Sequence, residues 1–112
     1  MNMTVEARHM DITDAMRQYV ESKLEKLPRF YDSIQTIEAV LDRDADDAVV
    51  EVVVSASRKH TFVAKQRDVE FYACVDQCVG KITEQIRRHK DRLRGRHGAP
   101  HGQPAGESPG TA

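Results

Sequence analysis

The chain has 112 residues, of which 39% are hydrophobic and 31% are charged, and its formal net charge is −1. This length suits one compact domain, and the composition is that of a globular protein rather than a disordered or membrane-spanning one. The longest apolar run, Ala48 to Val54, is interrupted by Glu51 and is far shorter than the ~20 residues of a membrane-spanning helix. A net charge near zero also argues against a general coat protein for nucleic acid.

The N-terminus and the cysteines indicate the cellular compartment. Residues 1–8 lack the apolar core of about 7 to 15 residues that a secretory signal needs. Two cysteines, Cys74 and Cys78, lie four residues apart in a helical pattern whose apolar neighbours favour packed, reduced thiols over a disulfide. We therefore expect a cytoplasmic protein without a membrane segment.

The first part of the chain predicts a strand, a helix and a second strand. Residues 2–8 alternate loosely and include β-prone side chains, which favours a short strand. Thr13 suits a helix start, and we expect Pro28 to close that helix. Between them an apolar stripe recurs at helical spacing, at Met16, Val20, Leu24 and Leu27. From 34 to 43, apolar and acidic side chains alternate, as in a strand with one solvated face.

The second part predicts two more strands and a long helix. The aspartates of 44–47 indicate a turn, and the β-prone segments 48–56 and 61–65 predict strands joined by the polar connection 57–60. Asp68 suits the cap of the last helix. Its buried face is predicted from apolar spacings of three and four at Phe71, Val75, Cys78, Val79, Ile82, Ile86, His89 and Leu93.

This order of elements predicts the fold class. A strand, a helix, three strands and a helix favour an α+β fold, a two-layer sandwich of topology β-α-β-β-β-α. We expect a four-stranded sheet with both helices on one face, in a domain that spans residues 1–94. Residues 95–112 are rich in Gly, Pro, Ser and Ala and contain no large apolar side chain, which predicts a disordered tail.

The charges are distributed unevenly along the chain. From Asp32 to Ser55 there are seven acidic residues against one basic residue, a local balance of −6. From Lys81 to Arg96 there are seven basic residues against two acidic ones, a local balance of +5. Such an asymmetry favours a polyanionic partner for the basic end.

The basic residues of the last helix flank its apolar face. One flank carries Lys81, Gln85, Arg88 and Arg92, and the opposite flank carries Arg87, Lys90 and Arg94. A helix dipole accounts for two or three basic residues near a C-terminus, so six favour contact with phosphates. The first helix adds Tyr19, Lys23 and Lys26 along one edge of its stripe. We expect the two helices to form the walls of one basic groove and their cations to converge on one surface.

No spacing predicts catalysis or metal binding. Asp42, Asp44 and Asp46 imitate the opening of a calcium loop, but the required glycine and closing glutamate are missing. The histidines show no ligand spacing, and His89 is best explained as a packing residue. Glycine-rich phosphate loops and nucleophile elbows are absent from the sequence. We expect no enzyme activity, cofactor, metal or small-molecule substrate.

Four longer stretches of the two predicted helices indicate which family the chain is similar to. They are 12–17 (ITDAMR) and 23–27 (KLEKL) in the first helix, and 70–76 (EFYACVD) and 88–93 (RHKDRL) in the second. These stretches resemble the short ribosome hibernation promoting factors and the ribosome-associated inhibitors, a family also known as the sigma-54 modulation proteins. The resemblance extends from Met1 to about Arg94.

The resemblance implies a fold, a partner and a site. The family has the β-α-β-β-β-α fold and lies in the decoding channel of the small ribosomal subunit, where it blocks translation in stationary or stressed cells. Carried over by position, the contacts to ribosomal RNA are Lys23, Lys26, Lys81, Gln85, Arg88, His89, Lys90 and Arg92. The family usually has aspartate where this chain has Glu70. The chain resembles the short form, without a second dimerisation domain, and its tail leaves open whether it promotes ribosome dimers or inactivates single ribosomes.

Two other functions remain open from the residues. A helix, three strands and a helix also form the core of double-stranded-RNA-binding modules, which would bind isolated duplexes as tightly as ribosomes. A protein-binding regulator could instead use the acidic sheet edge, with the basic helix merely solvated. Its partner would be recovered from a lysate without ribosomes and independently of salt.

Overall fold

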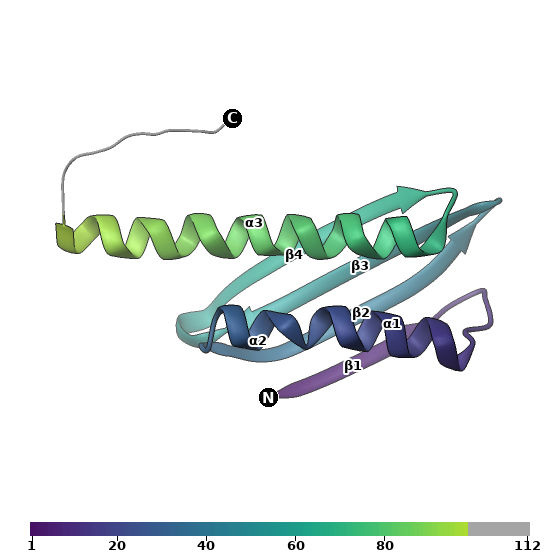
Figure 1. Ribbon diagram of the computed structural model, residues 1–112, viewed down its shortest axis with the longest axis horizontal. Helices are drawn as coiled ribbons and strands as arrows, with labels where there is room; N and C mark the ends of the chain where they lie inside the picture. Colours follow the sequence, from purple (N-terminus) through teal and green to yellow (C-terminus); the bar gives the residue numbers. More distant parts are fainter. Residues whose placement is uncertain (99–112) are drawn as a thin grey trace.

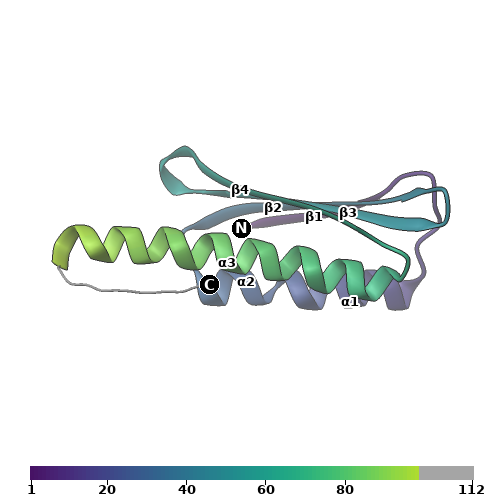
Figure 2. The ribbon, with the colours of Figure 1, turned by 90° about the horizontal axis from the view of Figure 1, so that it is seen from above.

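The computed structural model describes the backbone of residues 1–98 and the side chains of residues 1–93. Its elements in chain order are β1 (Asn2–Ala7), α1 (Asp14–Leu24), α2 (Lys26–Phe30), β2 (Ile34–Asp44), β3 (Asp47–Ala56), the 3-10 turn η1 (Ser57–Lys59), β4 (His60–Asp68) and α3 (Phe71–Gly98). Figure 1 shows α1 and α3 running side by side across the sheet, and Figure 2 shows that α1, α2 and α3 cover the same face of it. The predicted two-layer α+β fold is confirmed.

The sheet is mixed, with strand order β1-β2-β3-β4. β2, β3 and β4 form the predicted antiparallel meander, whereas β1 lies parallel to β2, from Asn2 opposite Thr36 to Ala7 opposite Leu41. Parallel neighbours need a crossover connection, and the segment containing α1 and α2 supplies it. The crossover places α1 under the β1 side of the sheet and leaves the β3–β4 side to α3.

The core lies between the sheet and the helices. Ile37, Ala39 and Leu41 of β2 are buried, whereas Glu38 between them is exposed, as the alternation predicts. On α3, the buried face contains Val75, Cys78, Ile82 and Ile86, together with Cys74. Both cysteines are free thiols within this core, as expected. Burial raises the pKa of Cys78 to about 12, so its thiol stays protonated at neutral pH.

Pro28 does not close the first helix, and that prediction is wrong. α1 ends at Leu24, and the chain enters the short helix α2, in which Pro28 is the third residue. A proline is tolerated in the first turn of a helix because the N–H it lacks would have no partner within the helix there. The same helix buries Leu27, which completes the predicted apolar stripe.

The cap of α3 also differs from the prediction. Glu70, not Asp68, holds the N-cap position, because its carboxylate accepts hydrogen bonds from the backbone N–H groups of Tyr72 and Ala73. Asp68 does not bind these two N–H groups. Its carboxylate accepts hydrogen bonds from the backbone N–H of Glu70 and from the side-chain amide of Gln77, which supports the cap. The residue that caps α3 is therefore Glu70, two positions after the one that the sequence favours.

Two element boundaries lie further along the chain than the sequence predicts. β4 continues from the predicted 61–65 to Asp68, since β3 provides a hydrogen-bonding partner as far as the pair Ala48 and Asp68. α3 continues past Leu93 to Gly98, so the predicted tail boundary at residue 95 falls within the helix. The rest of that tail, 99–112, lies outside the described residues. Within residues 1–98, none of the helices combines the length and apolarity needed to cross a membrane.

Candidate nucleic-acid interface

A groove lies between the first helices and α3. Its volume is about 410 Å³, and its lining includes Lys23 and Lys26 on one side and Val79 and Gly80 on the other. Within residues 1–93, the lining also includes the apolar side chains of Leu27 and Phe30 and one acidic residue, Asp76. The groove is thus an apolar trough with cationic residues along the α1–α2 side.

Asp76 joins the two helices and holds one of the predicted contacts. The Tyr19 hydroxyl donates a hydrogen bond of 2.6 Å to its carboxylate, and Lys23 Nζ lies 3.6 Å from the same oxygen. This hydrogen bond is the main reason that the pKa of Tyr19 rises to about 12, so the phenol remains a donor at physiological pH. The charge of Lys23 is therefore partly balanced within the protein.

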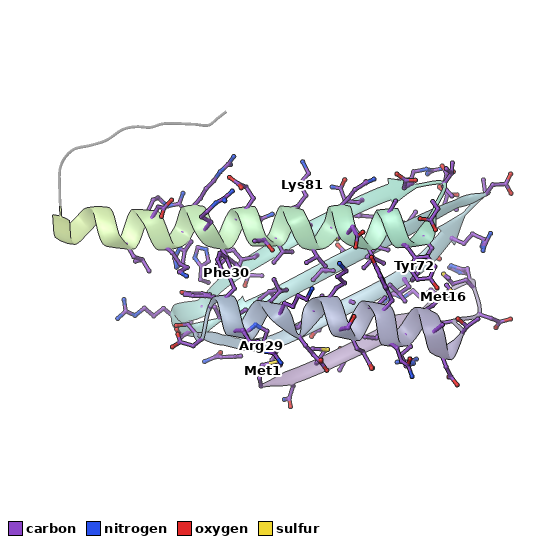
Figure 3. All side chains as sticks on the ribbon, in the orientation of Figure 1. Met1, Met16, Arg29, Phe30, Tyr72 and Lys81 are labelled. Carbon is purple, nitrogen blue, oxygen red and sulfur yellow. The ribbon has the colours of Figure 1, made fainter. Side chains whose placement is uncertain are left out.

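Lys90 fastens the C-terminal half of α3 to the end of α2. Its Nζ donates a 2.9 Å hydrogen bond to the carbonyl of Phe30 and lies 4.4 Å from the centroid of the Phe30 ring. Figure 3 shows Phe30 between α2 and α3, at the point where the two helices approach. The contact combines a helix C-terminal carbonyl with a cation–π interaction, which gives Lys90 a role in the fold.

The other flank of α3 lies beside the edge strand β4. Figure 3 shows Lys81 projecting away from α1. Gln85 pairs with the backbone of Val63, accepting its N–H at 3.3 Å and donating to its carbonyl at 2.7 Å. Arg88 and Arg92 line a smaller hollow against β4. The four residues predicted to share a flank do share it.

These positions contradict the prediction of a single groove walled by both helices. Lys23 and Lys26 line the groove between the helices, whereas Lys81, Arg88 and Arg92 belong to the opposite flank of α3. The strand order explains the difference, since α1 lies on the β1 side of α3 and its far flank borders β4. We call the first site the interhelix groove and the second the β4 flank.

An acidic residue on α3 balances part of the charge. Glu84 pairs with Arg87 and also accepts a hydrogen bond of 3.2 Å from Arg88 Nε. Such exposed pairs along one helix are weak, about 0.3–0.5 kcal/mol each, so a phosphate can displace them readily. Among the described residues, no hydrogen bond or ion pair engages Lys26, Lys81 or Arg92, which leaves these three cations for a partner.

His89 belongs to an aromatic cluster. Its ring stacks on His60 with centroids 4.0 Å apart and meets the rings of Tyr31 and Phe62 edge-on, at 5.9 Å and 5.6 Å. Burial lowers the pKa of His89, and the nearby charges of His60 and Arg92 lower it further, so the imidazole is mostly neutral at neutral pH. His89 packs, as the sequence indicates, and its ring is also only half-buried.

Three residues in or beside this cluster were not predicted from the sequence. Arg58 and Lys59 lie in the turn η1 after β3, and His60, the first residue of β4, brings this turn to the C-terminal half of α3 through its contact with His89. Two adjacent basic residues in a connection were the available signal, but the segment 57–60 predicts only a polar hairpin turn.

The chain matches a family model and several characterised proteins. Residues 3–94 match the model described as Sigma 54 modulation protein / S30EA ribosomal protein. The chain is 28% identical to the ribosome hibernation promoting factors of Azotobacter vinelandii and Escherichia coli (strain K12), over 82% and 84% of its own length and 85% and 98% of theirs.

Solved structures show the same architecture. The N-terminal domain of Protein Y from Thermus thermophilus is 31% identical, with a TM-score of 0.71 over 80% of this chain and 99% of that one. A ribosomal subunit interface protein from Coxiella burnetii, 23% identical, gives a TM-score of 0.75 over 81% of this chain and 99% of that one, a similarity that concerns the fold.

Proposed function

This chain belongs to the Sigma 54 modulation protein / S30EA ribosomal protein family, and from that premise we propose that it is a ribosome hibernation factor. It would bind the small ribosomal subunit through ribosomal RNA, in the decoding channel, and block translation in the cytoplasm of stationary or stressed cells. The names of its relatives, ribosome hibernation promoting factors, support this proposal.

The observation that carries the proposal is the pair of cationic surfaces on either side of α3. Lys26 at the interhelix groove and Lys81 and Arg92 on the β4 flank are cations without a partner in the described part of the chain. Cations on both flanks of one helix suit a channel with phosphates on two walls better than a flat surface. The presence of two cationic surfaces in place of one groove therefore changes the expected geometry of the contact between protein and RNA, but the contact is still made by cations and phosphates.

The mechanism is steric occlusion. A four-stranded sheet with an apolar core holds the helices rigidly, so the spacing between the two cationic surfaces is fixed before binding. Once held in the channel, the domain occupies the space that the ligands of translation need. The protein acts by binding and no bond is made or broken, which accords with a family of ribosome-associated factors.

A matched pair of charge reversals tests this proposal. Lys81→Glu changes the β4 flank, whereas Lys65→Glu makes the same change of charge on β4, on the sheet face opposite the helices. We expect Lys81→Glu to weaken co-sedimentation with ribosomes and to lower the slope of log affinity against log salt by about 1. Lys65→Glu should leave both quantities nearly unchanged. Equal behaviour of the two variants would refute the assignment of the β4 flank.

Two further measurements define the mode of action. Adding isolated duplex RNA as a competitor distinguishes a ribosome-specific factor from a general double-stranded-RNA binder, since only the latter binds both equally. Sucrose-gradient profiles of stationary-phase cells with and without the protein show whether ribosome dimers or single particles accumulate. Identical profiles in the two strains would contradict a hibernation role.

A further inference from the structure

The turn between β3 and β4 has an unusual residue pair for its backbone. Arg58 has φ 63° and ψ 29°, and Lys59 has φ 60°, so both residues are left-handed. The turn is closed by the N–H of His60, which donates to the carbonyl of Ser57. Left-handed conformations at both central positions define type I′ hairpin turns, which strongly prefer Asn-Gly or Gly-Gly. The backbone therefore gives no reason for two long cationic side chains here.

This turn is fixed against the C-terminal half of α3. The ring of His60, the residue after the turn, stacks on His89 with an interplanar angle of 24°, and Phe62 packs against both rings. Tyr31, from the segment after α2, closes the cluster by edge contacts with Phe62 and His89. Four aromatic rings from three parts of the chain thus hold the turn beside the β4 flank.

Two hollows share His60 as a lining residue. One, of about 300 Å³, is lined in part by Tyr31, Arg58 and His89. The other, of about 200 Å³, is lined by Phe62, Arg88 and Arg92, among others, and His60 lines both. Among the residues that the structure describes, neither lining contains an aspartate or a glutamate. The two hollows combine aromatic rings and guanidinium groups around one stacked histidine pair.

We propose that this site, which we call the hairpin pocket, binds an unpaired nucleotide of single-stranded RNA. A base packs against the aromatic wall formed by Tyr31, His60 and His89, and the phosphates on either side of it pair with Arg58 and Arg92. Lys59, the neighbour of Arg58 in the turn, adds a further positive charge. The assignment deepens the proposed function, on which it rests for the identity of the ligand as ribosomal RNA.

The chemistry of the lining selects this ligand. Bases that are free of a duplex stack on aromatic side chains, and guanidinium groups bind phosphates through paired hydrogen bonds. A duplex offers no exposed base face, so it would use the cations but not the rings. An acidic protein segment would likewise leave the rings without a matching surface. Together the rings and the cations favour a single strand.

A double substitution separates the charge of the turn from its conformation. Arg58→Asn with Lys59→Gly installs the pair that a type I′ turn prefers and removes both cations. We expect this variant to be at least as stable as the wild type, but to bind a fluorescent single-stranded adenosine hexanucleotide about tenfold more weakly. The slope of log affinity against log salt should fall by about 0.7 for each phosphate that the variant no longer neutralises.

Ala45→Gly is the matched control at the other hairpin. Ala45 has φ 57° in the turn between β2 and β3, so glycine relieves the same kind of backbone strain without changing a charge. Its affinity for the hexanucleotide should equal that of the wild type. A double variant that binds as tightly as Ala45→Gly would overturn the proposal.

The NMR signals of the histidine ring protons report on the pocket directly. Titration with the hexanucleotide should shift the ring signals of His60 and His89 but not that of His9, which pairs with Asp42 at the opposite end of the sheet. A duplex of the same length should shift them much less. Unshifted signals at saturation would show that the RNA lies elsewhere and would overturn the assignment.

The ribosome experiment keeps the two proposals apart. If the wild type pellets with ribosomes and the double variant pellets equally well at every salt concentration, the hairpin pocket is refuted and the hibernation function stands. If the wild type does not pellet, the hibernation function fails. The hexanucleotide titration uses no ribosomes, so it tests the pocket even if the wild type does not pellet.

Discussion

Gly80 lies in the interior of α3, where glycine is an unfavourable residue. It is exposed, its φ is not positive, and a Cβ built on it meets no atom within 4 Å. Glycine in a helix interior costs roughly 0.5–1 kcal/mol relative to alanine. Gly80→Ala should therefore raise the free energy of unfolding by roughly 0.5–1 kcal/mol. For a domain of this size, this corresponds to an increase in Tm of about 2–8 °C.

Thermal unfolding followed by circular dichroism at 222 nm measures this effect. Lys81→Ala is the control, because it changes the next residue of the same helix between two good helix formers, and its Tm should stay within about 2 °C of the wild type. A lower Tm for Gly80→Ala would refute the reasoning. It would mean that side chains of the interhelix groove close over Gly80 in solution and leave no room for a methyl group.

Three further predictions concern a cap, a histidine and a thiol. Glu70→Ala removes the acceptor for two N–H groups of the first turn of α3, so urea unfolding should show a loss of about 0.5–2 kcal/mol. Because the pKa of His89 is lowered from 6.5, the unfolded chain protonates first, and stability should decline as pH falls below about 6.5; His89→Gln should flatten that decline in urea titrations. Cys78, with a pKa of about 12, should react with a thiol reagent only at the rate of unfolding, and fast labelling of the native protein would contradict its burial.

Periodicity in the sequence was sufficient to predict the helices and strands and the face that each of them buries. The apolar spacing from Phe71 onward predicts α3, and its buried residues Ile82 and Ile86 are those that the pattern indicates. The alternation along 34–43 likewise predicts which side of β2 is buried. Both patterns depend only on the geometry of a single element, 3.6 residues per turn or two per repeat, so no other part of the chain is needed to interpret them.

Boundaries and caps depended on neighbouring segments. β4 reaches Asp68 because β3 pairs with it that far, and pairing between strands is not visible in either strand alone. Glu70 caps α3 because the chain geometry brings its carboxylate to two N–H groups, although Asp68 has the more favoured residue type. The chain stays helical through Pro28 because this residue falls in the first turn of α2, where a proline does not interrupt hydrogen bonding.

The sequence alone determined that α3 has two basic flanks, since side-chain directions around a helix follow from spacing. Only the tertiary structure decided what each flank borders. The parallel pairing of β1 with β2 fixes the crossover, which places α1 and α2 beside the flank of Lys90 and leaves the flank of Lys81 against β4. The cluster of His60 with His89 has the same origin, because these rings are 29 positions apart in the chain and meet only through the packing of the hairpin on the helix.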